Sequence, residues 1–173
     1  MASFSIEVIE AENPLEILEY GFVPDTGGAG RYRGGVSLAR SWRMLAEEGV
    51  LQVRADRQTH RPWGLAGGGP GAAGRNLLAR GTTAPPEWQS VPGKLTRTFR
   101  AGEVFRHELP GGGGYGPALE RDLDAVQRDL ADGFVTIAGA ARDYGVVAHG
   151  APPVIDVVAT AALRAQRAAA VPP

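Results

Sequence analysis

The stretch Pro24-Asp-Thr-Gly-Gly-Ala-Gly-Arg-Tyr-Arg-Gly-Gly35 is the first of three glycine-rich segments that dominate this sequence. The second is Gly64-Leu-Ala-Gly-Gly-Gly-Pro-Gly-Ala-Ala-Gly74, and the third is Pro110-Gly-Gly-Gly-Gly-Tyr-Gly116. Glycine allows close approach by another chain or a ligand, although such clusters are also typical of flexible linkers. These three segments carry arginine and aromatic side chains as well, which indicates ordered loops with something to contact.

Short runs of alternating or apolar residues lie between the loops and are bounded by turn residues. This pattern predicts strands and favours an antiparallel sheet system. The last two expected strands, residues 94–100 and 103–109, read as a hairpin across Ala101-Gly102. The expected strands are residues 4–8, where Phe4, Ile6 and Val8 alternate with polar residues, then 15–22, 36–45, 49–56, 94–100 and 103–109.

The character of the sequence changes after Gly116, where helical spacing replaces alternation. Asp122 is a plausible N-cap for a helix that runs up to Gly133, and Thr136 could cap a second helix that ends at Gly145. The alanine-rich residues 154–170 read as a terminal helix. The expected fold class is therefore α+β, with a mainly antiparallel β body over residues 1–116 and helices after it.

Length and composition suit one globular domain of 173 residues. No apolar run approaches the roughly 20 residues that span a bilayer, so no membrane partner is expected. The N-terminus lacks the positive charge and apolar core of a secretion signal. The chain has no cysteine, which excludes thiol nucleophiles and thiolate metal sites. Together these features favour the cytoplasm.

Charge is unevenly distributed along the chain although the net charge is -1. Residues 1–25 carry six acids and no base, whereas residues 31–106 carry thirteen bases and five acids. Acidic and basic segments could fold against each other, or the middle third could form a surface that faces anions. Nucleic-acid binding is not expected, because no motif or basic stripe with interleaved aromatic residues supports it.

Motifs that would identify a catalytic centre are missing from the sequence. His60, His107 and His149 do not stand in a metal-binding spacing, and there is no Gly-x-Ser-x-Gly elbow or Walker P-loop. Residues 69–74 match Gly-x-Gly-x-x-Gly, but neither a strand before them nor a helix after them supports dinucleotide binding. Two interpretations of charged residues follow. A solvated helix face is expected for Glu120, Asp122, Asp124, Asp129 and Asp132, whereas a carboxylate or phosphate could be held by Arg31, Arg33 and Arg75.

Several motifs in one order resemble the hydantoinase B/oxoprolinase family. Residues 24–35 resemble its Pro-Asp-(Ser/Thr)-Gly-Gly-(Ala/Pro)-Gly-x-(Tyr/Phe)-Arg-Gly-Gly segment. The similarity covers about residues 5–147. The further matching segments are Asn13-Pro14, Asp56-Arg57, residues 62–71, residues 110–116, Asp129-x-x-Asp-Gly133 and residues 140–146.

The resemblance implies work inside a larger complex. Members of the family act with a hydantoinase A-type chain that handles ATP; together they open cyclic amides, and relatives carboxylate ketones. The family's metal-binding motifs lie in a long N-terminal part that this sequence does not contain. We therefore expect no cofactor or metal on this chain, with ATP and a divalent metal in partner chains. The expected partners are hydantoinase A-like chains, hydantoinase B N-terminal-like chains and a small-molecule substrate.

The resemblance also selects candidate residues. Loop-backbone roles are implied for Gly27, Gly28, Gly30, Gly68, Gly69, Gly112 and Gly113, and contacts to another chain or to a site for Arg31, Arg33, Asp56, Arg57 and Trp63. The expected division is a hydantoinase B C-terminal-like domain over residues 1–147, with a linker and terminal helix over 148–173. A scaffold subunit or a small-anion-binding module are the alternatives. Substrate, reaction type and the choice between a natural small subunit and a fragment stay open.

Overall fold

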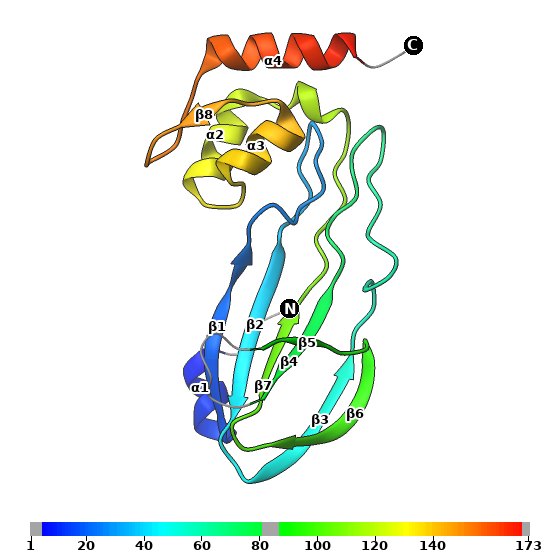
Figure 1. Ribbon diagram of the computed structural model, residues 1–173, viewed down its shortest axis with the longest axis vertical. Helices are drawn as coiled ribbons and strands as arrows, with labels where there is room; N and C mark the ends of the chain where they lie inside the picture. The colour runs from blue at the N-terminus through cyan, green and yellow to red at the C-terminus, as the bar shows by residue number, and fades with distance from the viewer. Residues whose placement is uncertain (1–4, 81–86, 171–173) are drawn as a thin grey trace. The chain divides into compact units, whose positions relative to one another are not determined.

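The computed structural model describes residues 5–80 and 87–170 and shows an α+β fold, as the sequence predicts (Figure 1). The chain forms two compact units. The first lies within Met1–Gly21, Leu38–Thr59 and Gly74–Leu109, and the second within Phe22–Ser37, His60–Ala73 and Pro110–Pro173. Among the described residues, no helix is both long and apolar enough to cross a membrane.

A five-stranded antiparallel sheet forms the body of the first unit (Figure 1). Its spatial order is β1-β2-β7-β4-β5, and β7 pairs with both β2 and β4. Phe105 of β7 therefore lies between Trp42 and Leu78 and is almost fully buried. The strands are β1 (Leu15–Val23), β2 (Ser37–Met44), β4 (Arg75–Ala79), β5 (Gln89–Ser90) and β7 (Val104–Glu108).

A two-stranded ribbon completes the core of this unit. Strands β3 (Glu48–Arg54) and β6 (Lys94–Arg100) pair in antiparallel register. Their inward residues alternate with exposed ones, which is the period expected of a strand with one buried face. The shared core consists of Met44, Leu51, Val53, Leu78, Phe99 and Phe105.

The predicted hairpin between residues 94–100 and 103–109 is wrong. The turn at Ala101-Gly102 exists, with Gly102 at φ +78°, but it leads from one sheet into another. Strand β6 pairs with β3, and β7 pairs with β2 and β4. The carboxylate of Glu103, buried beside the turn, accepts hydrogen bonds from the Arg97 side chain and the Arg100 backbone N–H, and so holds the crossing point.

The predicted strand near the N-terminus is also wrong, because the structure has helix α1 (Ile6–Glu12) there. Phe4 lies outside the described residues. Two described apolar residues in alternation are too few to define a period, whereas glutamate and alanine favour helix over strand. Pro14 follows directly after the C-cap Asn13, and proline cannot continue a helix.

The second unit contains the helices that follow Gly116. They are a 3₁₀ turn (Ala118–Glu120), α2 (Leu123–Ala131), α3 (Ile137–Tyr144) and α4 (Val157–Ala169). The predicted caps are confirmed: Asp122 accepts from Ala125 N–H at 3.0 Å, and Thr136 accepts from Gly139 N–H at 2.9 Å. The core of this unit consists of Val126, Leu130, Val135, Ala140, Tyr144, Val146 and Ala148.

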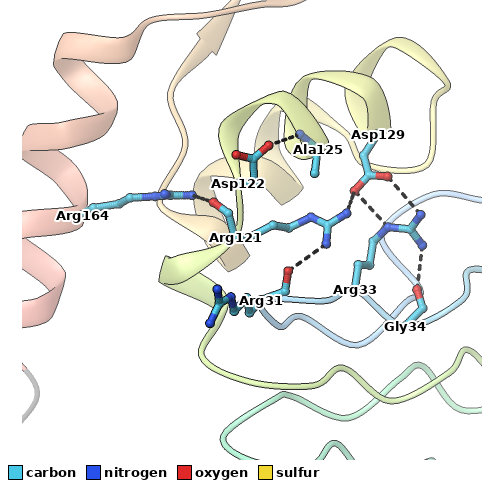
Figure 2. A network of polar contacts seen from close by, with 8 residues as sticks. All are labelled: Arg31, Arg33, Gly34, Arg121, Asp122, Ala125, Asp129 and Arg164. Atoms are coloured by element: carbon cyan, nitrogen blue, oxygen red, sulfur yellow. Dashed lines mark hydrogen bonds and ion pairs between the residues drawn. The ribbon is translucent and has the colours of Figure 1, made fainter.

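The terminal helix begins later than the sequence predicts. Val154 and Ile155 form strand β9 (Val154–Ile155), which pairs with β8 (Ala148–His149). Asp156 then caps α4 by accepting from Ala159 N–H at 2.9 Å. Arg164 of α4 donates to the backbone oxygen of Arg121 (Figure 2). It also donates to the backbone oxygen of Tyr144, so the helix is bonded to the rest of the second unit. The division of the chain at residue 147 stays a prediction.

Candidate interface on the glycine-rich loops

The three glycine-rich loops form one hydrogen-bonded assembly in the second unit, which we call the glycine bundle (residues 25–35, 62–73 and 110–116). Gly112 connects two loops, since its oxygen accepts from Gly28 N–H and its own N–H donates to Gly35 O, both at 2.8 Å. Gly69 connects all three, because it donates to Ala29 O at 2.6 Å and accepts from Gly114 N–H at 2.9 Å. Hydrogen bonds between the loops therefore pair backbone N–H and C=O groups that a buried loop would otherwise leave without partners.

Backbone runs so close to backbone in this bundle that side chains do not fit between the loops. A Cβ atom added to Gly28 would lie 2.5 Å from Gly114 N, and one added to Gly30 would lie 2.6 Å from Tyr115 N. At Gly69 an added Cβ would make an ordinary contact, 3.5 Å from Ala29 O. Each of the other predicted loop glycines would bring a Cβ within 3.0 Å of backbone atoms: Gly27, Gly68, Gly112 and Gly113.

Four large exposed side chains on the glycine-rich loops are called the apolar patch: Tyr32, Trp63, Leu65 and Tyr115. Their exposed fractions are 62%, 67%, 59% and 54%. Backbone contacts place Tyr32, Leu65 and Tyr115 next to one another, and Trp63 lies two residues before Leu65 in the same loop. Tyr32 and Tyr115 exchange two backbone hydrogen bonds of 2.9 Å, and their ring centroids are 6.2 Å apart. Leu65 forms a backbone bridge to Tyr115. Main-chain bonds thus hold three of the four residues at fixed spacing.

Charge lies beside the apolar patch. The Arg31 guanidinium is 5.9 Å from the centre of the Tyr32 ring, within the range of a cation–π contact. Its Nη1 atom is also 3.9 Å from Glu120 Oε2, and both side chains are 57% exposed. An exposed ion pair of this length contributes little to stability. Arg31 is therefore a surface group beside the patch.

Arg33 points the other way, into a buried ionic network (Figure 2). Its Nε and Nη2 atoms donate to the two carboxylate oxygens of Asp129, each at 3.0 Å, and Nη1 donates to Gly34 O at 2.6 Å. Arg121 donates to the same carboxylate at 2.7 Å and to Arg31 O at 3.2 Å. The anion that Arg33 binds is thus a carboxylate of the protein itself.

Asp129 corrects the prediction of a solvated acidic face, because its side chain is only 9% exposed. Sequence reasoning missed both Asp129 and Arg121 as organising residues. The available signal was the Asp129-x-x-Asp-Gly133 motif, in which Asp129 O accepts from Phe134 N–H and Val135 N–H at the end of α2. Both the side chain and the backbone of Asp129 therefore connect α2 to its surroundings.

Tyr144 lies beside this network and is 1% exposed. Burial raises the pKa of its phenol to about 12, against the opposing effect of the nearby Arg121 and Arg33 charges. The Arg121 guanidinium is 5.7 Å from the centre of the Tyr144 ring. Its Nε is buried without a hydrogen-bond partner among the described residues. Two guanidinium groups and one carboxylate are thus enclosed together.

The remaining candidates lie in the first unit. Arg57 has a left-handed backbone (φ 64°), and its carbonyl accepts from Gly74 N–H at 3.0 Å. Asp56 lines an open cavity of about 540 Å³ together with Arg54 and Lys94. The structure therefore places Arg31, Arg33 and Trp63 in one unit and Asp56 and Arg57 in the other.

The uneven charge of the sequence is compensated within the first unit. Arg43 bonds Glu16 at 2.6 Å, and Arg106 forms an ion pair with Glu19. Acids from the N-terminal segment therefore face bases from the middle third, in agreement with the interpretation that acidic and basic segments fold against each other. Arg75, an earlier candidate for anion binding, lies 3.5 Å from Glu108.

Histidines do not gather into a metal site in the described part of the chain. No group of three or more His, Cys, Asp or Glu residues there is arranged to hold a metal ion. His107 Nδ1 is 2.6 Å from Asn76 Oδ1, and burial together with the Arg40 charge lowers the pKa of the His107 ring. His107 therefore serves the internal polar bonding of the sheet.

Residues 1–118, which hold all three loops of the bundle, match the model of the hydantoinase B/oxoprolinase family. The chain belongs to this family. An uncharacterized protein of Methanocaldococcus jannaschii is 40% identical over 141 residues, which are 82% of this chain and 24% of that protein. Caprolactamase subunit beta of Pseudomonas jessenii is 31% identical over 157 residues, or 87% of this chain and 26% of that subunit.

Solved structures of larger enzymes contain the same fold as this hydantoinase B/oxoprolinase member. The ATP-dependent caprolactamase of Pseudomonas jessenii gives a TM-score of 0.78 at 31% identity, over 94% of this chain and 28% of that chain. A nucleotide-free acetone carboxylase gives 0.80 at 25% identity, over 98% of this chain and 27% of that chain. This chain thus spans about a quarter of the length of four curated relatives that it matches. It spans only 8–10% of four others, three of them 5-oxoprolinases.

Proposed function

We propose that this chain is a subunit or segment of an ATP-dependent enzyme that opens cyclic amides or carboxylates a small substrate, in which it completes the substrate cavity or the interface. Its partners are hydantoinase A-like and hydantoinase B N-terminal-like chains, which supply ATP and a divalent metal. The complex works in the cytoplasm. Relatives of this chain supply the reaction classes: a caprolactamase and an acetone carboxylase, both described as ATP-dependent.

The observation that carries the proposal is the construction of the glycine bundle within the family-matched residues. The bundle is rigid because main-chain bonds and close backbone contacts fix it. Its outward residues are tyrosine, tryptophan and leucine, with arginine beside them, and aromatic residues and arginine are enriched at protein interfaces. A rigid surface of this composition suits a component that shapes a larger assembly.

A pull-down of the tagged chain from its source cells tests the proposal, with mass spectrometry of the co-purifying chains. We expect large hydantoinase A-like and hydantoinase B-like chains in a fixed ratio, and ATP-dependent turnover by the recovered complex. Recovery of the folded chain without either partner would refute the proposal.

A non-catalytic scaffold is the alternative, and two exposed arginines separate it from a role in the site. Arg31→Ala and Arg57→Ala remove candidate site groups in the second and first unit respectively. Lower turnover with intact assembly indicates a role at the site. Loss of assembly indicates docking alone.

A further inference from the structure

We infer that the apolar patch is the docking surface for the remaining three-quarters of a hydantoinase B-type polypeptide. This inference rests on the proposed function and names the partner and the contact residues. The occupant is protein, either joined to this chain or separate from it.

Composition and exposure single out this patch as a protein-binding surface. Three of its four members are tyrosine or tryptophan, which dominate the energetic centres of interfaces. All four expose more than half of their surface. Arg31 and Glu120 lie at the edge with exposed charges, in keeping with the polar rim that surrounds an apolar centre.

Pre-organisation strengthens the argument. The patch residues come from all three loops of the bundle, whose relative positions are fixed by hydrogen bonds such as Gly69 N–H to Ala29 O at 2.6 Å. The Tyr115 backbone binds both Tyr32 and, through a bridge, Leu65. Binding therefore orders little backbone, which lowers the entropic cost of association.

The length of the relatives identifies the occupant. In the caprolactamase and acetone carboxylase structures, the fold of this chain takes up 28% and 27% of a longer polypeptide. The fold is therefore built to exist beside the rest of such a polypeptide. A surface made for that neighbour is expected within the part of the chain that the family shares.

A second exposed apolar surface provides the competing candidate. Val154, Val157 and Val158 are exposed near the start of α4, Val158 by 81%. These residues lie outside the family-matched residues 1–118, whereas the whole apolar patch lies inside them. The acetone carboxylase structure covers 98% of this chain, so the shared fold extends beyond residue 118 as well. The patch is preferred because it holds three aromatic residues and because main-chain bonds fix Tyr32, Leu65 and Tyr115, and the valines serve as the control.

Site-specific photocrosslinking tests the inference. The tagged 173-residue chain is expressed in its source cells with p-benzoylphenylalanine at position 32 or 63, and at position 158 as the control. We expect crosslinks to a hydantoinase B-type polypeptide from positions 32 and 63, and at least about tenfold less from position 158. The aromatic replacement is large and apolar, so it preserves the character of the patch.

The outcomes separate this inference from the proposed function. A hydantoinase B-type chain that co-purifies but crosslinks through position 158, and not through 32 or 63, overturns the docking site and leaves the function standing. Crosslinks from position 63 to a second copy of this chain also overturn it. Absence of any hydantoinase-type chain, with or without crosslinking, overturns both.

Side-chain removal supplies an independent measurement. Trp63→Ser and Tyr115→Ser should each reduce the recovered hydantoinase B-type chain by about tenfold or more, since truncating an interface anchor commonly costs that much. Val158→Ser should change recovery little. The Tyr115 substitution leaves both backbone bonds to Tyr32 in place, and an unchanged urea midpoint verifies the fold. Wild-type recovery by both patch variants would contradict the inference.

Discussion

Arg33 and Asp129 are 96 positions apart in the sequence, yet they form a two-pronged ion pair in which both N–O distances are 3.0 Å. The pair connects the first glycine-rich loop to helix α2. Paired hydrogen bonds between guanidinium and carboxylate fix orientation as well as distance. The loop that carries Tyr32 is therefore held on both sides, by backbone on one and by the ion pair on the other.

Asp129→Asn should destabilise the second unit by about 3–5 kcal/mol, because it leaves the buried Arg33 and Arg121 without a compensating negative charge. Urea denaturation followed by circular dichroism measures the loss. Asp132→Asn is the matched control, since Asp132 lies on the same helix end and is exposed. Equal effects of the two substitutions would show that the network contributes no stability.

Gly28→Ala should cost about 1–3 kcal/mol, because the added Cβ would meet the backbone of the other two loops and force them apart. Gly35→Ala is the matched control within the same loop. A Cβ there meets nothing within 4 Å, so stability should stay within about 0.5 kcal/mol of the wild type. The difference between the two unfolding free energies is the test. A Gly28→Ala protein as stable as Gly35→Ala would rule out tight backbone contact.

Thr136→Ala should destabilise α3 by about 1 kcal/mol. The threonine hydroxyl oxygen accepts from Gly139 N–H at 2.9 Å, and the hydroxyl donates to Asp25 at 2.6 Å. Thr136→Ser keeps the oxygen and should recover most of the loss. The thermal unfolding midpoints of the wild type and the two variants test this. A serine variant as unstable as the alanine variant would assign the effect to the lost methyl group.

Tyr144 should make stability fall in alkaline solution. Its pKa is raised from 10 to about 12 in the folded protein. The folded state thus favours the protonated phenol, and the associated stability is fully present below pH 10 and is lost as pH rises from 10 towards 12. Tyr144→Phe should flatten this part of the pH dependence of the unfolding free energy. A difference absorbance titration at 295 nm that places the Tyr144 ionisation near pH 10 would disagree with the structure.

Features set by neighbours in the sequence could be predicted from it. The caps at Asp122 and Thr136 were found because a cap needs an oxygen and an N–H three residues later. Strands β1, β2 and β3 were found from local alternation. The family was identified from glycine-rich motifs in their order, and the match over residues 1–118 confirms it.

Features that depend on residues far apart in the sequence could not be predicted from it. The turn at Ala101-Gly102 looks like a hairpin, yet nothing local reveals that the partner of β6 is β3. The burial of Asp129 depends on Arg33, which lies far away in the chain. The exposed candidates Arg31, Asp56, Arg57 and Trp63 stay predictions, because fold geometry places them without assigning them a role.

The glycine bundle divides its own sequence into two kinds of position. Where backbone meets backbone, as at Gly30, a side chain of any size is excluded. Where a residue points outward, as at Tyr32, the frame depends on the backbone N–H and C=O groups of that residue and not on its side chain. Substitutions at the outward positions can therefore change what this surface binds, one residue at a time, without changing the backbone frame that carries them.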